Sequence, residues 1–295
     1  MVALNLVNAP TRLDDALVQV PPPSNWPPLP LPIRPHWRTV WETPSARLQE
    51  GAFFTPCDEQ LRNALPLESY IARVALLIPR NSHPANTSCV IHLAGTGDHG
   101  FQRRLKLGAP LLKENIATMV LESPFYGERR PKQQQGAKLL CVSDLLLLGS
   151  VFEGGVHAAM VGSLHPTPLA VLPFLAPHSA AVAFCEGILQ YGTAWDALLQ
   201  DQVRSSGTTL EQVRERMRAV LCLTNVTKFP APKKPEAVIF VSATNDAYIP
   251  RHSVLEFQRA WPGSEVRWVT GGHVSSYIFH SNKFRRAIRD GIARL

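Results

Sequence analysis

The stretch Ala237-Val-Ile-Phe-Val-Ser-Ala-Thr-Asn-Asp246 decides the fold class, because it is a continuous apolar run that ends in polar residues. A short run of this kind, over 237–243, predicts a strand that is buried on both faces. Farther along the chain, 253–260 has the pattern of a helix and 265–270 that of another strand. A strand, a helix and a strand in this order indicate a parallel pair joined by a helix.

The same alternation extends through the preceding part of the chain. Strands are predicted at 46–56, 70–79, 89–93, 116–121 and 170–174, and helices at 104–115, 137–148, 156–163 and 179–223. A capping box at Thr208-x-x-Glu211 opens a long amphipathic helix in the last of these segments. Apolar residues at Phe284, Ile288, Ile292 and Leu295 predict a final helix. The pattern predicts an α/β fold with three layers, in which helices cover both faces of a mostly parallel sheet.

Length and proline content suggest two unequal regions. The chain has 295 residues, enough for one large domain with a full core. It contains 26 prolines, and eight of them lie between Pro21 and Pro35. We therefore expect 1–40 to be an extended, proline-rich segment and 41–295 to form the folded domain.

Composition excludes several functional classes. The net charge of +7 is scattered, and the longest basic cluster, at Arg129-Arg130-Pro131-Lys132, is too short to predict nucleic-acid binding. No uninterrupted apolar run reaches about 20 residues, so no transmembrane segment is expected. Five cysteines without a C-x-x-C pair are typical of reduced thiols, and Met1–Asn5 lacks the features of a secretory signal. These features favour an intracellular protein, cytoplasmic by default, with an organelle left open. The oligomeric state is not predicted.

Two strand ends carry residues suited to chemistry, since ligands of open α/β sheets bind at the carboxyl ends of strands. Gly95, Thr96 and Gly97 follow the strand at 89–93. Their backbone N–H groups suit an oxyanion hole or an anion nest, and a plain tight turn is the competing interpretation. The third glycine of a dinucleotide fingerprint is lacking, no spacing of His, Cys and carboxylate residues suggests zinc, and no cofactor is expected.

Asp246 follows the strand at 237–243, and His273 lies on the loop after the next strand, 27 residues later. A carboxylate at one strand end and an imidazole at its neighbour can pair as the acid and base of a catalytic triad. The alternative is a structural aspartate turn and an incidental histidine.

The order of these features resembles the α/β-hydrolase fold, whose triad runs Ser, Asp or Glu, then His. More specifically, the chain resembles the alpha/beta hydrolase domain-containing protein 18 family, in particular its plant members. Four segments carry the resemblance: His92-Leu-Ala-Gly-Thr-Gly-Asp-His99, Leu121-Glu-Ser-Pro-Phe-Tyr-Gly-Glu-Arg-Arg-Pro131, Asn245-Asp-Ala-Tyr-Ile-Pro-Arg251 and Gly271-Gly-His-Val-Ser-Ser-Tyr-Ile-Phe279. The resemblance implies that Asp246 and His273 are the acid and base, that Gly95–Gly97 is the oxyanion loop, and that 179–223 is a helical lid.

The family's nucleophile is missing from this sequence. Its members carry Gly-x-Ser-x-Gly-Gly before a helix that begins Val-His-Ala-Ala-Met, and this chain keeps the helix start from Gly154 to Met160. Aligned on Gly154, Phe152 stands where the serine belongs. The strand that leads to the serine is missing too, and about thirty residues of family sequence are absent between Gly149 and Gly154. A skipped exon, a gene-model error or a true loss would each produce this junction.

The resemblance implies a serine ester or lipid hydrolase, and the missing serine implies that this chain is a catalytically defective form. Ser123, Ser143 and Ser150 are the substitutes that we considered, and none lies at the expected turn. Arg129 and Arg130 are expected either to meet an anionic head group or to lie in a solvated loop. The alternative function is a non-catalytic protein that binds a small acyl or acidic ligand in the remaining cleft. A third hypothesis is an adaptor that acts through its proline-rich segment.

Overall fold

The computed structural model describes residues 33–56, 63, 65–80, 82–95, 97–132, 134, 154–193, 195–203 and 209–295. The strands are β1 (His36–Glu42), β2 (Ala46–Phe54), β3 (Ile71–Pro79), β4 (Ser88–His92), β5 (Ile116–Leu121), β6 (Ile239–Ala243) and β7 (Glu265–Val269). The α-helices are α3 (Gln102–Gly108), α5 (Gly154–Leu164), α6 (Ala180–Cys185), α7 (Trp195–Val203), α8 (Leu210–Leu221), α9 (Arg251–Ala260), α10 (His273–Phe279) and α11 (Ser281–Ala293). Within this described part, no helix combines the length and the apolar character needed to cross a membrane.

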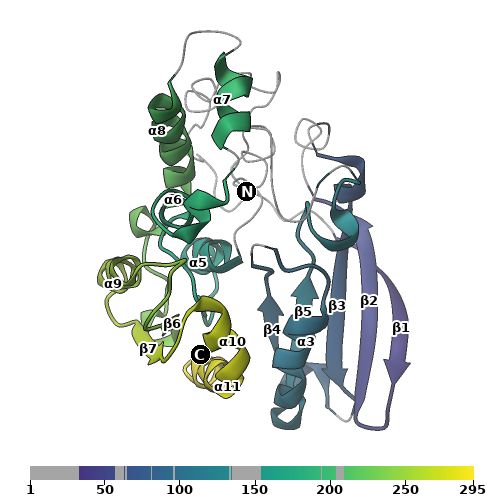
Figure 1. Ribbon diagram of the computed structural model, residues 1–295. Coiled ribbons are helices and arrows are strands. Elements are labelled where there is room, and N and C mark those ends of the chain that lie inside the picture. The colour runs from purple at the N-terminus through teal and green to yellow at the C-terminus, as the bar shows by residue number, and fades with distance from the viewer. Residues whose placement is uncertain are drawn as a thin grey trace.

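The larger sheet has the strand order β1-β2-β3-β5-β4 (Figure 1). Its first four strands pair antiparallel in this order, and β5 pairs parallel with β4. The predicted strands at 46–56, 70–79, 89–93 and 116–121 correspond to β2, β3, β4 and β5. The sheet is therefore mixed, with its parallel pair at the end that adjoins the rest of the molecule.

The smaller sheet is the parallel pair β6-β7. β6 is buried along its whole length because helices cover both of its faces. Phe240 packs with Phe257 of α9, with Trp261 just after that helix and with α5, whereas Ile239 and Val241 pack with Phe284 of α11. This is the three-layer arrangement that the apolar run at 237–243 predicted.

The strand predicted at 170–174 is reduced to two parallel bridges, Val171 with Val238 and Phe174 with Val241. Pro173 lies between them, and proline has no N–H to donate to a ladder. Its carbonyl still accepts a hydrogen bond from the Val241 N–H at 3.3 Å. The segment thus follows β6 without forming a regular strand.

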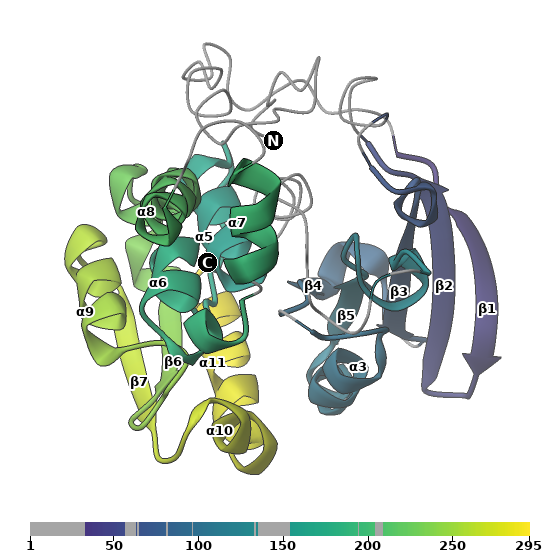
Figure 2. The ribbon, with the colours of Figure 1, turned by 45° about the horizontal axis from the view of Figure 1, so that its top comes forward.

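A break separates the two sheets. β4 is the last strand of the larger sheet, and no strand among the residues described here pairs with its outer edge (Figure 2). Residues 135–153, which include the helix predicted at 137–148, lie outside the described part. The sequence predicts that one central strand is lacking at this place. Ile288 of α11 spans the break, packing in one cluster with Val90 of β4 and with Leu172 and Phe174.

The helical segment expected at 179–223 contains α6, α7 and α8. Their shared cluster includes Ala181, Leu198 and Met217, one residue from each helix. The capping box lies one position later than expected, with Thr209 and Gln212 making the reciprocal bonds. At the other end of the chain, β1 begins at His36, ahead of the domain boundary expected at residue 40.

A tight turn carries the chain from β7 into α10. Gly271 has φ +111°, a backbone conformation that side chains disfavour. Gly272 is the N-cap of α10, and its N–H donates to Ser275 Oγ at 2.9 Å. His273 is therefore the first residue of a helix, and its predicted position on a loop was wrong.

We expect Gly271→Ala to destabilise the protein by roughly 1–3 kcal/mol, because a residue with a Cβ is strained at this positive φ. That Cβ would also lie 2.9 Å from Ser275 Oγ. Gly272→Ala is the matched control, since its backbone is extended and its Cβ would lie 3.4 Å from the nearest atom. Urea unfolding of both variants checks this, and equal midpoints would contradict it.

We expect the buried His92 to make the free energy of unfolding decrease in acid. Burial, together with the nearby Arg104 guanidinium, lowers the pKa of His92 to about 4. As the pH falls from 6.5 towards 4, the unfolded chain binds a proton here that the folded chain does not, so the free energy of unfolding decreases. The full loss is about 3 kcal/mol, at about 1.4 kcal/mol per unit of pKa.

Urea unfolding across this pH range should show a smaller loss for His92→Gln than for the unsubstituted protein. His36→Gln is the control, because His36 is an exposed histidine on β1. If His92→Gln loses as much stability in acid as the unsubstituted protein, the burial of His92 is not the cause.

Candidate active site

The structure brings Asp246 and His273 together, as the strand ends predicted. Asp246 Oδ2 lies 2.8 Å from His273 Nδ1. The other carboxylate oxygen, Oδ1, accepts the backbone N–H groups of Tyr248 at 2.8 Å and Ile249 at 3.0 Å. The Asp246 side chain is only 3% exposed and that of His273 is 28% exposed. A buried, anchored carboxylate thus holds an imidazole whose other side faces outward.

Asp246 holds the His273 imidazole in the orientation that a general base needs. With Nδ1–H donating to the carboxylate, Nε2 keeps its lone pair and can accept a proton from a hydroxyl group. The Tyr248 ring lies against the imidazole, with ring centroids 4.7 Å apart. None of the described residues makes a hydrogen bond to Nε2. Asp246 and His273 thus have the geometry of a carboxylate–imidazole pair, and no hydroxyl group of the described residues is bonded to the imidazole.

The glycine loop follows β4 as predicted. The Asp98 N–H donates to the Gly95 carbonyl at 3.0 Å, and Gly97 has φ +76°, so the loop makes a tight turn. Thr96 lies outside the described residues. This geometry fits both interpretations, so the role of the loop as an oxyanion hole stays a prediction.

Arg104 of α3 anchors this loop and was not identified from the sequence. Its guanidinium is buried and forms an ion pair with Asp98 at 2.8 Å. It also donates to the carbonyls of His92, at 3.2 Å, and Gly100, at 2.6 Å. Desolvation lowers the pKa of Arg104, and the Asp98 carboxylate opposes that shift. The arginine therefore joins the end of β4 to the glycine loop.

The glycine loop and His273 lie on the same side of the molecule. Tyr277 of α10 donates its hydroxyl to the Arg103 carbonyl at 3.3 Å, next to Arg104. Burial raises the pKa of Tyr277, and the negative charge of Asp98 adds to that shift. Tyr277 therefore connects α10 to α3, the helix whose Arg104 holds the glycine loop.

The serines that we considered do not complete the triad in the described residues. Ser123 follows β5, is 1% exposed, and its Oγ has no hydrogen-bond partner. It is therefore not bonded to His273. Ser143, Ser150 and Phe152 lie outside the described residues.

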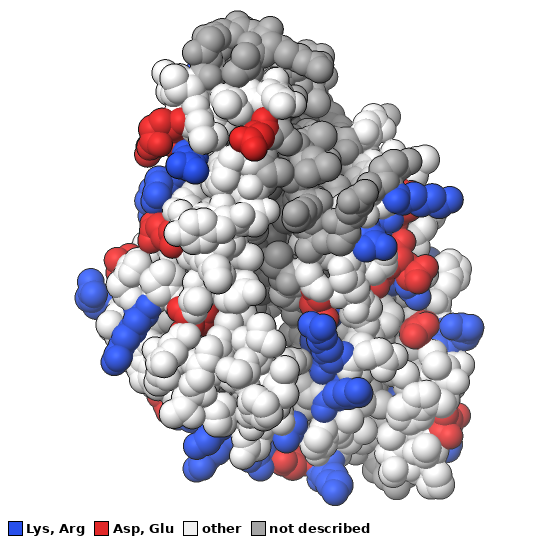
Figure 3. All heavy atoms as spheres, viewed as in Figure 1, with Lys and Arg blue, Asp and Glu red and all other residues white. Residues whose placement is uncertain are grey.

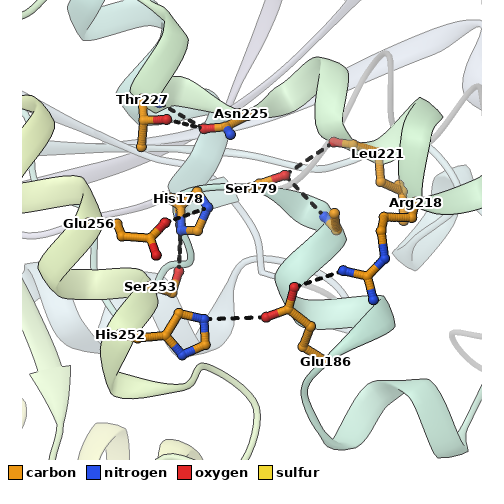
Figure 4. A network of polar contacts seen from close by, with 11 residues as sticks. His178, Ser179, Glu186, Arg218, Leu221, Asn225, Thr227, His252, Ser253 and Glu256 are labelled. Atoms are coloured by element: carbon orange, nitrogen blue, oxygen red, sulfur yellow. Dashed lines mark hydrogen bonds and ion pairs between the residues drawn. The ribbon is translucent and has the colours of Figure 1, made fainter. Parts of the chain in front are cut away.

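A second serine–histidine–carboxylate group lies at the base of the helical segment (Figure 4). His178 Nδ1 is 2.8 Å from Ser253 Oγ, and His178 Nε2 is 3.4 Å from Glu256 Oε2. Ser253 is fully buried, so its hydroxyl cannot meet a substrate. Desolvation lowers the pKa of His178. The group is structural, and it ties the residues before α6 to α9.

The structure corrects both expectations for Arg129. This side chain is only 4% exposed, and its guanidinium donates to the carbonyls of Glu122 at 2.6 Å and Ser69 at 3.0 Å. It is therefore a buried structural group, neither a solvated residue nor a ligand for a head group. Arg130 beside it is exposed. In the described ranges, no three His, Cys, Asp or Glu side chains form a group that would hold a metal ion.

Comparison with solved structures shows the fold. Acetyl xylan esterase from Paenibacillus sp. R4 superposes with a TM-score of 0.59 at 13% identity, over 88% of this chain and 89% of that one. Acetyl xylan esterase 1 from Thermoanaerobacterium sp. JW/SL YS485 gives a TM-score of 0.53 at 12% identity, over 86% and 88% of the two chains. Both are esterases, and at this identity the likeness confirms the predicted α/β-hydrolase-like fold alone.

A family model described as alpha/beta hydrolase domain containing 18 matches residues 28–153, 151–206 and 199–294. These segments together span nearly the whole chain, including the described Asp246–His273 pair. The chain belongs to the alpha/beta hydrolase domain containing 18 family.

Proposed function

We propose that this chain is a catalytically defective member of its α/β-hydrolase family. The observation that carries the proposal is the Asp246–His273 pair. Its hydrogen bond of 2.8 Å orients the imidazole as a base, and no hydroxyl group of the described residues is bonded to that imidazole. A serine hydrolase works by transferring the serine proton to this base while the oxygen attacks the ester carbonyl. Without the hydroxyl, no acyl-enzyme forms, and loss of the nucleophile in such enzymes lowers kcat by about 10⁶-fold.

The family match is divided into three segments, and one division falls at the expected junction. The first two matched segments, 28–153 and 151–206, meet at 151–153, the position of Phe152. The break between β4 and the Val171–Phe174 segment falls between the same two parts of the chain. Both observations favour loss of a strand together with the serine turn that follows it.

Two other expectations become part of the proposal. We assign the chain from β1, at His36, to residue 295 to one domain, so that its start lies ahead of the expected boundary, and 179–223, which contains α6, α7 and α8, to a lid. An intracellular location remains a prediction from the cysteines.

We expect the full chain not to react with a fluorophosphonate probe, because no serine is activated by His273. Mass spectrometry of the treated protein checks this. The positive control is a variant with a strand and a Gly-x-Ser-x-Gly turn inserted between Gly149 and Gly154. That variant should be labelled at the new serine, and His273→Ala should abolish the labelling. Labelling of the natural chain that is lost in His273→Ala would overturn the proposal.

The exposed nitrogen of His273 favours a second candidate function, the binding of an acyl ligand with a carboxylate. The imidazole is 28% exposed and is held by Asp246 on its other side. A protonated Nε2 can donate a charge-assisted hydrogen bond to a carboxylate.

We expect a medium-chain fatty acid such as decanoate to bind roughly tenfold more weakly to His273→Ala, the cost of one hydrogen bond to a charged group. Isothermal titration calorimetry measures this, with His36→Ala as the control for loss of an exposed histidine. Equal affinities for His273→Ala and the unsubstituted protein would exclude this site as the binding site.

A further inference from the structure

Helix α10 presents an apolar ridge to solvent. Val274 is 57% exposed, Ile278 is 61% exposed and Phe279 is 76% exposed. Val274 and Ile278 lie four residues apart, so they share one face of the helix. The inner face is the one that packs, since Ser276 is buried and the Tyr277 ring lies 5.9 Å from the Phe284 ring of α11. The three side chains of the ridge therefore lie outside the packed core.

The part of the sequence that carries this ridge is rich in cations. Between Glu265 and Asp290 the sequence contains no acidic residue, and it contains five cations: Arg267, Lys283, Arg285, Arg286 and Arg289. Arg267 and Arg289 are paired with carboxylates, and the Arg286 guanidinium is 3.9 Å from Asp290. Lys283 is exposed and has no ion pair within the described part of the chain.

Helix α3 adds cations on the other side of α10. The Tyr277 hydroxyl reaches the Arg103 carbonyl at 3.3 Å, so the two helices are neighbours. The Arg103 and Lys106 side chains are exposed. Figure 3 shows Lys and Arg side chains over the region of α3, next to the uncharged surface of α10. The exposed cations Arg103, Lys106 and Lys283 thus lie on the two helices, α3 and α11, that contact α10.

We propose that α10 docks this protein onto an anionic lipid bilayer. Three projecting apolar side chains suit shallow insertion between lipid head groups, and the flanking cations are attracted by anionic lipids. A specific protein partner would need roughly 800 Å² on each side, which is more than a short ridge of three side chains offers. His273 is the first residue of α10, so docking places the imidazole and its exposed face at the lipid surface. This proposal does not depend on whether the chain hydrolyses esters.

Co-sedimentation with vesicles tests the proposal. The full chain should bind vesicles of phosphatidylcholine mixed with phosphatidylglycerol, and binding should weaken as sodium chloride is raised. Phe279→Ser should lower the partition coefficient roughly tenfold, the effect of withdrawing one aromatic side chain from the interface. Leu67→Ser is the matched control, because Leu67 is equally exposed, at 76%, on the short helix η1 (Leu67–Ser69) far along the chain.

Ile278→Asp is a second variant on the same ridge, and Lys283→Glu tests the charge. Thermal unfolding of each variant should give an unchanged midpoint, because the substituted positions are exposed. Binding that is equal for Phe279→Ser and Leu67→Ser would overturn the proposal. So would equal binding to vesicles of phosphatidylcholine alone, or a solution dimer that Phe279→Ser dissociates.

Discussion

The register of β6 against β7 positions the chemistry of this molecule. Ala243 pairs with Val269 at the end of the ladder, and the contact continues past both strands. The Thr244 N–H donates to the Val269 carbonyl at 2.9 Å, and the Asn245 N–H donates to the Gly271 carbonyl at 3.0 Å. The bond between Asp246 and His273 follows from this register. A slip of one residue would turn the side chains of a strand to the opposite face and separate the pair.

The elements that the sequence predicted well are those with continuous burial. β5 has the predicted bounds, Ile116–Leu121, and its apolar run is largely buried. β1 was missed because every one of its residues is exposed, so its sequence shows no alternation of buried and exposed positions. α10 was missed because Gly-Gly-His-Val-Ser-Ser has weak helix propensity. Contacts distant in sequence, such as that of Tyr277 with Arg103, hold it in place.

The residues of the candidate site also divide into those that the sequence predicted and those that it did not. Asp246 and His273 were predicted because each follows a strand, and the strand order of a parallel sheet brings such positions together. Arg104 was not predicted, because its burial and its bonds to His92 and Gly100 are made only when α3 packs on the sheet. The bond between His178 and Ser253 joins residues 75 positions apart, and no local pattern marks either of them.

The Asp246–His273 pair and the glycine loop belong to two parts of the molecule that are held by different contacts. β6, β7 and α10, which carry Asp246 and His273, all lie after the junction at 149–154, and their contacts are made mainly with α9 and α11. β4 and its glycine loop lie before the junction and are held by α3 through Arg104. α11 packs against both parts through Ile288, and no strand of the described residues lies between the two sheets. The bonds that hold Asp246 and His273 in place are made within the part of the chain after residue 154, so the pair does not depend on the segment in which the serine turn is expected.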